Sequence, residues 1–302
     1  MPTSQILMIR PAAFGYNAET AANNAFQQAP QQAETQAIAE AARAEFDAFV
    51  NKLVAAGVQV HVVEDTPTPP KPDAVFPNNW LSFHRGGTAI TWPMFSPLRR
   101  AERREDIIHE LAKEHPVRQR IHLEYFEQEN RFLEGTGSLI LDRVHKIAYA
   151  CRSVRTDEVV LDEFCRLMDY QKLLFDATDA TGTPIYHTNV MMALGDKLAV
   201  LCTEAIRDPK QRKTLLTSLE ETNKELLPIS LEQMNAFAGN MLEVQNTRGE
   251  PIQVMSQSAW QSLSPSQRRL IEKHAQPLYA DLHTIEQYGG GSARCMMAEM
   301  FF

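Results

Sequence analysis

Five strand-like segments recur along this sequence at nearly equal intervals of 58, 52, 51 and 55 residues. Each is entered through a small or polar residue; these are Asn79, Gly137, Asn189, Asn240 and Cys295. Helical periodicity recurs at the same spacing, near residues 33–56, 98–114, 156–170, 208–226 and 264–276. The pattern predicts five copies of one β-rich unit with a helix, packed around a common axis as propeller blades are. The alternative interpretation is that the segments are evenly spaced by chance.

In such an arrangement, residues that open equivalent strands converge on one central cavity. Short β-rich runs lie between the helical patterns, namely VQVHVVE, HKIAYA, KLAVLC and ISLEQM. Thr156, Asp208 and Ser264 precede three of the helices as caps. The proline-dense stretch 66–72 is typical of a loop, and no Gly/Ser/Pro linker divides the chain. We therefore expect residues 1–302 to form a single catalytic domain.

The composition and charge of the chain disfavour several classes of function. No apolar run approaches the ~18–20 residues of a membrane span, and the first residues lack the features of a signal peptide. A cytoplasmic location is therefore expected. The net charge is −8, without a basic stripe, which disfavours nucleic-acid partners. The densest charge run, RRAERRED at 99–106, is interpreted as a solvated helix face.

Cys295 follows three glycines and Arg294. Glycines allow close approach of the backbone and present free N–H groups, and a neighbouring cation would favour a thiolate. These features indicate a nucleophile; a buried structural cysteine after a flexible turn is the alternative. The other three cysteines lie in apolar contexts and are expected to pack as small hydrophobic residues.

His187 lies beside one of the five recurrent strand entries. A cysteine nucleophile needs a base that later protonates the leaving group, and histidine suits both steps near neutral pH. Glu134 opens a Gly-rich turn, from which a carboxylate could orient that histidine. A satisfied core histidine and a solvated loop glutamate are the alternatives.

Three polar residues, Asp73, Asn78 and Asn79, surround an otherwise apolar strand. Polar groups entering a buried strand cost stability unless paired, so they are either turn residues or the floor of a polar pocket. Arg155 precedes a helix start, where a cation is unfavourable, so a ligand carboxylate is a reasonable partner. A surface arginine is the alternative.

Taken together, six segments in order resemble the guanidino-group-modifying enzymes, the amidinotransferase or pentein superfamily, and most closely its citrulline-utilisation hydrolases. The matching strings are PDAVFPNN, SPLRRAE, FLEGTGS, ACRSVRTDE, IYHTN and GGGSARCM. The resemblance covers essentially the whole chain. It implies a five-bladed pseudo-symmetric α/β propeller of ββαβ units.

The resemblance also implies site roles. Cys295 would be the nucleophile, His187 the general acid/base and Glu134 its orienting carboxylate. Arg155 and one of the pair Arg99 and Arg100, for which we select Arg100, would bind the substrate carboxylate. Asp73, Asn78, Asn79 and Asn189 would complete the substrate pocket.

This sequence departs from the deiminases of that superfamily at three positions. Their guanidinium-binding aspartates are matched here by Asn79, Gly137 and Asn189. A carboxamide carries no charge and both donates and accepts, which fits a neutral ureido group better than a guanidinium. We therefore expect a citrulline-like substrate, converted to ornithine, ammonia and CO2 through a covalent cysteine intermediate.

Other outcomes stay open: an arginine or dimethylarginine deiminase, an amidinotransferase, or a binding protein. The histidines show no metal-ligand spacing, and no nucleotide-binding glycine motif is present. We expect a small amino-acid substrate, no metal and no cofactor. The sequence leaves open whether the chain acts as a homo-oligomer, and whether Asn240 touches ligand.

Overall fold

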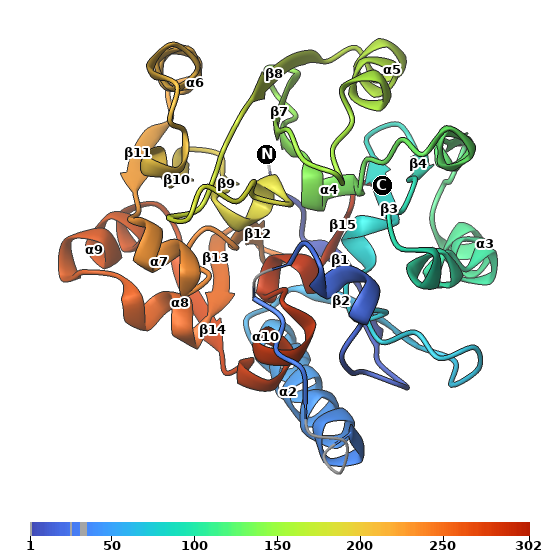
Figure 1. Ribbon diagram of the computed structural model, residues 1–302. Helices are drawn as coiled ribbons and strands as arrows, with labels where there is room; N and C mark the ends of the chain where they lie inside the picture. Colours follow the sequence, from blue (N-terminus) through green and yellow to red (C-terminus); the bar gives the residue numbers. More distant parts are fainter. Residues whose placement is uncertain (1, 25, 31–34) are drawn as a thin grey trace.

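The computed structural model describes residues 2–24, 26–30 and 35–302. Within them, five three-stranded sheets share one topology, in which the central strand has one antiparallel and one parallel neighbour. The sheets surround a common centre, and the long helices lie outside them (Figure 1). This agrees with the predicted α/β class and its five-fold repeat.

The strands of each sheet, in spatial order, are as follows. They are β15 (Ala298–Met300), β1 (Gln5–Arg10) and β2 (Gln59–Glu64); β3 (Leu81–His84), β4 (Thr88–Thr91) and β5 (Gln119–His122); β6 (Ile140–Asp142), β7 (Ile147–Cys151) and β8 (Gln171–Phe175); β9 (Met192–Leu194), β10 (Leu198–Leu201) and β11 (Glu225–Pro228); and β12 (Leu242–Gln245), β13 (Pro251–Ser256) and β14 (Gln276–Ala280).

A helix joins the central strand of each sheet to its parallel neighbour, as a parallel connection requires. These helices are α2 (Thr35–Ala55), α3 (Glu105–Glu114), α5 (Glu158–Met168), α6 (Pro209–Glu221) and, in the last unit, α8 (Gln257–Ser262) with α9 (Pro265–His274). Shorter helices are α1 (Ala18–Ala21), α4 (Gly135–Ser138), α7 (Leu231–Asn235) and α10 (His283–Gly289). Each unit is therefore strand, strand, helix, strand.

Helix α2 shows why the periodic segments fold as they do. Its buried residues are Ile38, Ala42, Phe46, Phe49 and Leu53. Spacings of three and four place these side chains on one face, which packs in the core beside β1, β2 and β14. Each fully buried large apolar side chain contributes about 1.5–3 kcal/mol. The predicted start of this helix at residues 33 and 34 lies outside the described residues.

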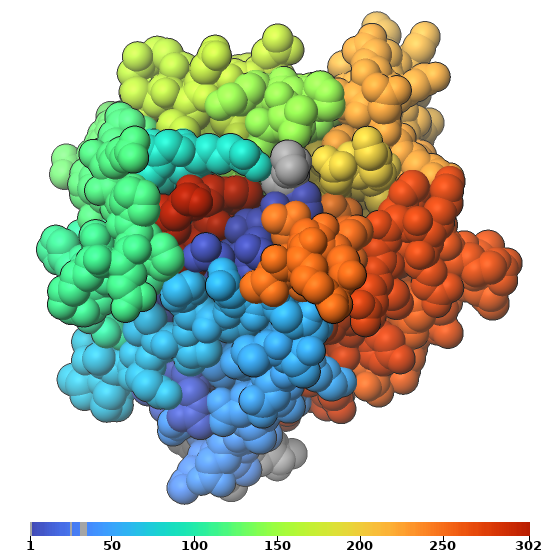
Figure 2. Space-filling model, turned by 180° about the vertical axis from the view of Figure 1, so that it is seen from behind, coloured from blue at the N-terminus to red at the C-terminus, as the bar shows by residue number. Residues whose placement is uncertain are grey.

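The two ends of the chain meet in the first sheet. Strand β15 pairs antiparallel with β1, with Gln5 opposite Met300, and the Thr3 hydroxyl donates to the Met300 carbonyl. Figure 2 shows segments from both ends, dark blue and dark red, together at the centre of the opposite face. The strand that follows Cys295 therefore completes a sheet begun at the other end of the chain.

Three local predictions need correction. The strands begin two or three residues later than predicted, because short turns precede them; these include 3₁₀ turns at Pro77–Asn79, Thr188–Val190 and Ala293–Met296. The run ISLEQM was expected to be β-rich but contains helix α7, since Ser230 and Gln233 form a capping box. Asp157, rather than Thr156, caps α5.

Asp208 and Ser264 cap α6 and α9, as predicted. Among the helices that the structure describes, none has both the length and the apolar character that a bilayer span needs.

Candidate active site

The turns before the strands and the N-terminal segment enclose one cavity at the centre of the units. Its lining is Thr20, Asn24, Asp73, Phe76, Asn79, Arg99, Arg155, Tyr186, His187, Gly289, Gly290, Gly291 and Cys295. The side chains brought together come from four units and from both ends of the chain. Five of the predicted site residues line this cavity: Asp73, Asn79, Arg155, His187 and Cys295.

Two carboxamides contact the sulfur of Cys295. Nδ2 of Asn189 and Nδ2 of Asn240 each lie 3.3 Å from Sγ. Asn240 is fixed in this position, because its Nδ2 also donates to the Asn189 carbonyl at 3.0 Å and its Oδ1 accepts from the Arg294 N–H at 3.0 Å. Two directed N–H groups stabilise negative charge that forms on the sulfur.

Arg294 does not supply the free positive charge that the sequence indicated. Its guanidinium lies 3.1 Å from Glu299 Oε2 and donates to the Met297 carbonyl at 3.0 Å. Its charge is therefore balanced by a carboxylate, and the described groups that stabilise the Cys295 sulfur are the asparagine amides.

His187 and Glu134 form a buried pair. Nε2 of His187 lies 2.8 Å from Oε2 of Glu134, and the Phe95 N–H donates to the other oxygen at 3.0 Å. Burial lowers the pKa of His187 to about 4, against the opposing effect of the Glu134 carboxylate. Burial alone would raise the pKa of Glu134, but the charge of Arg155 and the hydrogen bond from His187 hold it well below its usual range.

These protonation states fix the tautomer of His187. An ionised carboxylate only accepts, so Nε2 carries the proton donated to Glu134. Nδ1 is left with a lone pair and can take a proton. A neutral, oriented imidazole that lines the same cavity as a cysteine is suited to general acid–base catalysis.

Gly137 permits the close approach of His187 and Asn79. A Cβ at this position would lie 2.8 Å from His187 Nδ1 and 2.4 Å from Asn79 Nδ2. We expect Gly137→Ala to displace both groups and lower kcat/KM at least ~100-fold, because small misplacements of reacting groups are costly. Steady-state kinetics and thermal melts check this. Gly15→Ala, where an added Cβ meets nothing within 4 Å, is the control; equal activity of the two variants would contradict the expectation.

Arg99 is the centre of a buried ion network. Its guanidinium lies 2.8 Å from Glu102, 3.6 Å from Asp73 and 3.8 Å from Glu134. Nη1 also donates to Asn79 Oδ1 at 2.9 Å. Burial raises the pKa of Asp73, and the Arg99 charge opposes this shift.

The network corrects two predictions about the run at 99–106. Arg99 and Glu102 are buried, so the run is not simply a solvated helix face. Arg100, which we had selected for the substrate carboxylate, does not line the cavity. Its side chain is 31% exposed and pairs with Glu127 at 3.2 Å. The structure brings Arg99 to the cavity instead.

Arg155 is buried and already has protein partners. Its Nε donates to Asn23 Oδ1 at 2.8 Å, Nη2 donates to the Thr20 carbonyl at 3.0 Å, and Nη1 lies 3.5 Å from Glu134. The same N-terminal segment reaches Asp73 through Asn17 Nδ2 at 2.7 Å. The surface alternative for Arg155 is therefore wrong.

Asn78 and Asn189 lie behind the cavity and do not line it. Oδ1 of Asn78 accepts from Asn79 Nδ2 at 3.1 Å. Among the described residues, no hydrogen-bond partner reaches Asn78 Nδ2 or Asn189 Oδ1, although both atoms are buried. Asn78 therefore positions Asn79, while Asn189 is aimed at the sulfur.

Sequence reasoning missed or misplaced several contributors. The contact of Asn240 with the sulfur was left open, although its place in the repeat pointed to it. Tyr186, whose hydroxyl donates to the Gly290 carbonyl at 2.6 Å, carried no signal beyond its neighbour His187. The segment 17–24 has no motif, and only the fold brings it to the site.

The family described as N,N dimethylarginine dimethylhydrolase, eukaryotic, matches residues 10–302. No curated protein matches the sequence.

Solved structures match the fold over nearly the whole chain. A cyanobacterial arginine dihydrolase, ArgZ, superposes with a TM-score of 0.76 at 17% identity, covering 98% of this chain and 40% of that one. Its N-terminal domain bound to substrate gives 0.75 at 16% identity, covering 98% of both chains. An adduct of dimethylarginine dimethylaminohydrolase with S-methyl-L-thiocitrulline gives 0.66 at 14% identity, covering 99% and 100%. The chain thus spans less than half of full-length ArgZ.

Proposed function

This chain belongs to the N,N-dimethylarginine dimethylhydrolase family of the guanidino-modifying pentein superfamily, and from that premise we propose that it is a cysteine-dependent hydrolase of ureido amino acids. The proposed substrate is citrulline-like, and the products are ornithine, ammonia and CO2. The proposed fold is the pentein α/β propeller, with residues 1–302 as one catalytic domain. The pairing of β15 with β1 supports this, because it joins both ends of the chain in one sheet.

The charges that line the cavity support a ureido substrate over a guanidinium substrate. Its described lining has two arginines, Arg99 and Arg155, and one carboxylate, Asp73. His187 is neutral at pH 7, because its pKa is about 4. Each nearby carboxylate already contacts an arginine. None of these carboxylates is therefore free to pair with an added guanidinium, whereas the two arginines suit a neutral ureido group joined to a carboxylate.

The first half of the proposed reaction forms a covalent intermediate. The Cys295 proton passes to Nδ1 of His187, and Sγ forms a bond to the ureido carbon. The bond from that carbon to the terminal nitrogen breaks as His187 returns the proton, and ammonia leaves. The substrate is then a thiocarbamate ester of Cys295. The amides of Asn189 and Asn240 stabilise the charge on sulfur in this step.

The second half releases the product. Water gives a proton to Nδ1 of His187 and attacks the same carbon, and the carbon–sulfur bond breaks. Cys295 recovers its proton, and the carbamate that leaves loses CO2 to give ornithine. Glu134 holds the imidazole in one orientation throughout. Arg155, with Arg99 in place of Arg100, is proposed to bind the substrate carboxylate, and Asp73 and Asn79 its polar end.

An arginine dihydrolase is the second candidate. It is favoured by the similarity of the whole chain to the N-terminal domain of ArgZ, whose name records that activity. A dimethylarginine hydrolase is favoured in the same way by the matched family description. The transferase alternative requires an amine acceptor in place of water.

The experiment that separates these reactions measures ammonia, citrulline and ornithine from L-citrulline, L-arginine and dimethylarginine. Ornithine from citrulline, with no product from arginine or dimethylarginine, supports the proposal. Ornithine from both arginine and citrulline supports a dihydrolase, and citrulline as the final product from arginine or dimethylarginine supports a deiminase-type hydrolase. Ornithine formed only when an amine acceptor is added identifies the transferase.

Asn79→Asp tests the charge argument. A carboxylate here adds a negative charge beside Arg99, so the cavity should tolerate a guanidinium better. We expect the ratio of kcat/KM for arginine to that for citrulline to rise at least ~10-fold, or ~1.4 kcal/mol. Asn79→Ala, which removes the same hydrogen bonds without adding charge, is the control. No rise in the ratio would refute the argument.

The pH dependence follows from the lowered pKa of His187. Its neutral form persists down to about pH 4, so the acid limb of kcat/KM should fall near that value rather than near 6.5. Between pH 4 and pH 6.5 the imidazole of the unfolded chain binds a proton that the folded one does not, so the free energy of unfolding decreases as pH falls.

The variant Glu134→Gln should move the acid limb of kcat/KM to still lower pH, since Glu134 raises the pKa of His187. An acid limb near pH 6.5 in the wild-type protein would contradict the assignment of this limb to a buried, neutral His187.

A further inference from the structure

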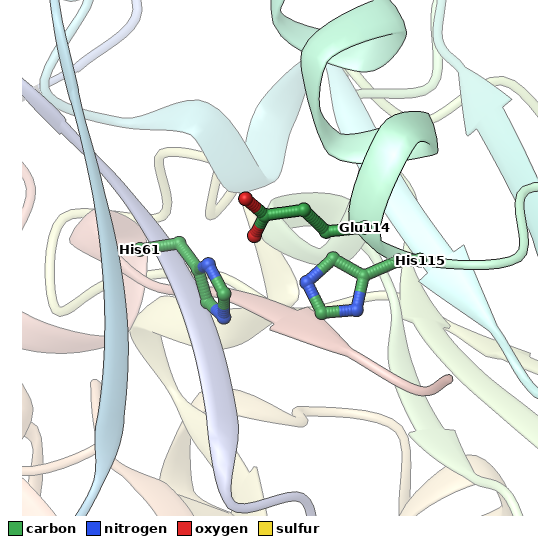
Figure 3. A group of neighbouring side chains, drawn as sticks. All are labelled: His61, Glu114 and His115. Carbon is green, nitrogen blue, oxygen red and sulfur yellow. The ribbon is translucent and has the colours of Figure 1, made fainter.

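A second group of chemically reactive side chains lies away from the cavity, between two units. His61 lies on β2 of the first sheet, and Glu114 and His115 lie at the end of α3 of the second unit. One ligand atom from each lies within 4.8 Å of the other two. Figure 3 shows the three side chains facing one another from the strand and the helix end.

One of the two imidazoles, that of His115, lacks a partner at a ring nitrogen among the described residues. Nε2 of His115 is buried and has no hydrogen-bond partner among the described residues. The ring of His115 is held by stacking on Phe302, with centroids 4.7 Å apart, and meets the ring of His61 edge-on at 5.0 Å. A buried nitrogen without a partner costs about 1–3 kcal/mol, so it points to a missing ligand.

The carboxylate of Glu114 is similarly placed for a cation. Glu114 is the last residue of α3, where the helix dipole disfavours negative charge. The one basic side chain in this last turn, Lys113, pairs with Glu110 at 2.6 Å instead.

From these contacts we propose that His61, Glu114 and His115 form a zinc-binding site that links the first unit to the second. Imidazole nitrogens and carboxylate oxygens are both ligands that Zn²⁺ takes in proteins, and water would complete a tetrahedron. Bonds of about 2.0–2.1 Å place such ligands about 3.3 Å apart, so binding draws the three side chains together. The sequence pattern did not indicate this site, because residue 61 and residues 114–115 meet only in the fold.

Zinc binding to the Cys295→Ser protein tests the proposal, since this variant removes the competing thiol of the candidate active site. We expect one equivalent of Zn²⁺ in equilibrium dialysis against zinc sulfate. Affinity should fall at least ~100-fold in His61→Ala and in His115→Ala made in the same background. His109→Ala, an exposed histidine on the same helix, is the matched control and should bind as the parent does.

Co²⁺ provides a readout that does not depend on variants folding. In the Cys295→Ser protein, bound Co²⁺ should show the intense visible absorption of a four-coordinate site, displaced by one equivalent of Zn²⁺. Unchanged zinc affinity in His61→Ala, or cobalt spectra matching the hydrated ion, would overturn the proposal. Neither measurement depends on which substrate the enzyme hydrolyses, so failure here and failure of the proposed activity are distinguishable.

Discussion

Cys295→Ser is expected to lower kcat/KM for the preferred substrate by about 10⁴-fold or more. The hydroxyl of serine is a far weaker nucleophile here than a thiolate, and losses of this size follow removal of a nucleophile that acts with its base as a unit. The two amide donors at 3.3 Å from the sulfur are positioned to stabilise charge at this atom. Steady-state assays at saturating and limiting substrate measure the effect.

Intact-protein mass spectrometry after an acid quench distinguishes a lost nucleophile from a damaged site. The wild-type protein should carry one substrate-derived adduct during turnover, and Cys295→Ser should carry none. Cys165→Ser is the control, because Cys165 lies on the buried face of α5 and does not line the cavity. A similar loss of kcat/KM in both variants, or an adduct that persists in Cys295→Ser, would show that Cys295 is not the nucleophile.

Arg99→Met is expected to lower the free energy of unfolding by about 3–5 kcal/mol, the cost of breaking a buried ion pair from one side. The change leaves the buried carboxylates of Glu102 and Asp73 without the cation that contacts both. Urea denaturation at pH 7 measures the difference. Part of the loss should be recovered at lower pH, where these carboxylates become protonated.

Arg100→Met is the matched control for this change. The side chain is 31% exposed and its ion pair with Glu127 is near the surface, so a loss of no more than about 1 kcal/mol is expected. Comparable destabilisation by both variants would show that the Arg99 network contributes no more than a surface pair.

The repeat was predictable because spacing is a property of the sequence alone. Nearly equal intervals between strand entries indicated five equivalent units, and the helical periodicity of segments such as α2 comes directly from their apolar residues. The exact strand starts were not predictable in the same way. Turns such as Pro77–Asn79 are short, and neighbouring apolar residues satisfy strand and turn patterns equally well.

Parts of the candidate site depended on contacts that no local pattern contains. Arg99 and Arg100 are adjacent and chemically identical, and only the packing of a 3₁₀ turn decides which one faces inward. Asn23 reaches Arg155 across 132 positions in the chain, through a segment without a motif. Three residues were easier to predict, since each lies in or near a recurrent strand entry; these are Cys295, His187 and Glu134.

The pairing of the last strand with the first has a consequence for biosynthesis. The Thr3–Met300 hydrogen bond joins positions 297 residues apart, so the ring of units cannot close until residue 300 has left the ribosome. Until then β1 lacks its β15 neighbour, and the cysteine is absent from the centre. Because long-range pairing slows folding, the unclosed chain exposes a strand edge for longer than a domain built from local contacts. The central cavity is therefore complete only after the segment that carries Cys295 and β15 has been made and has packed against β1.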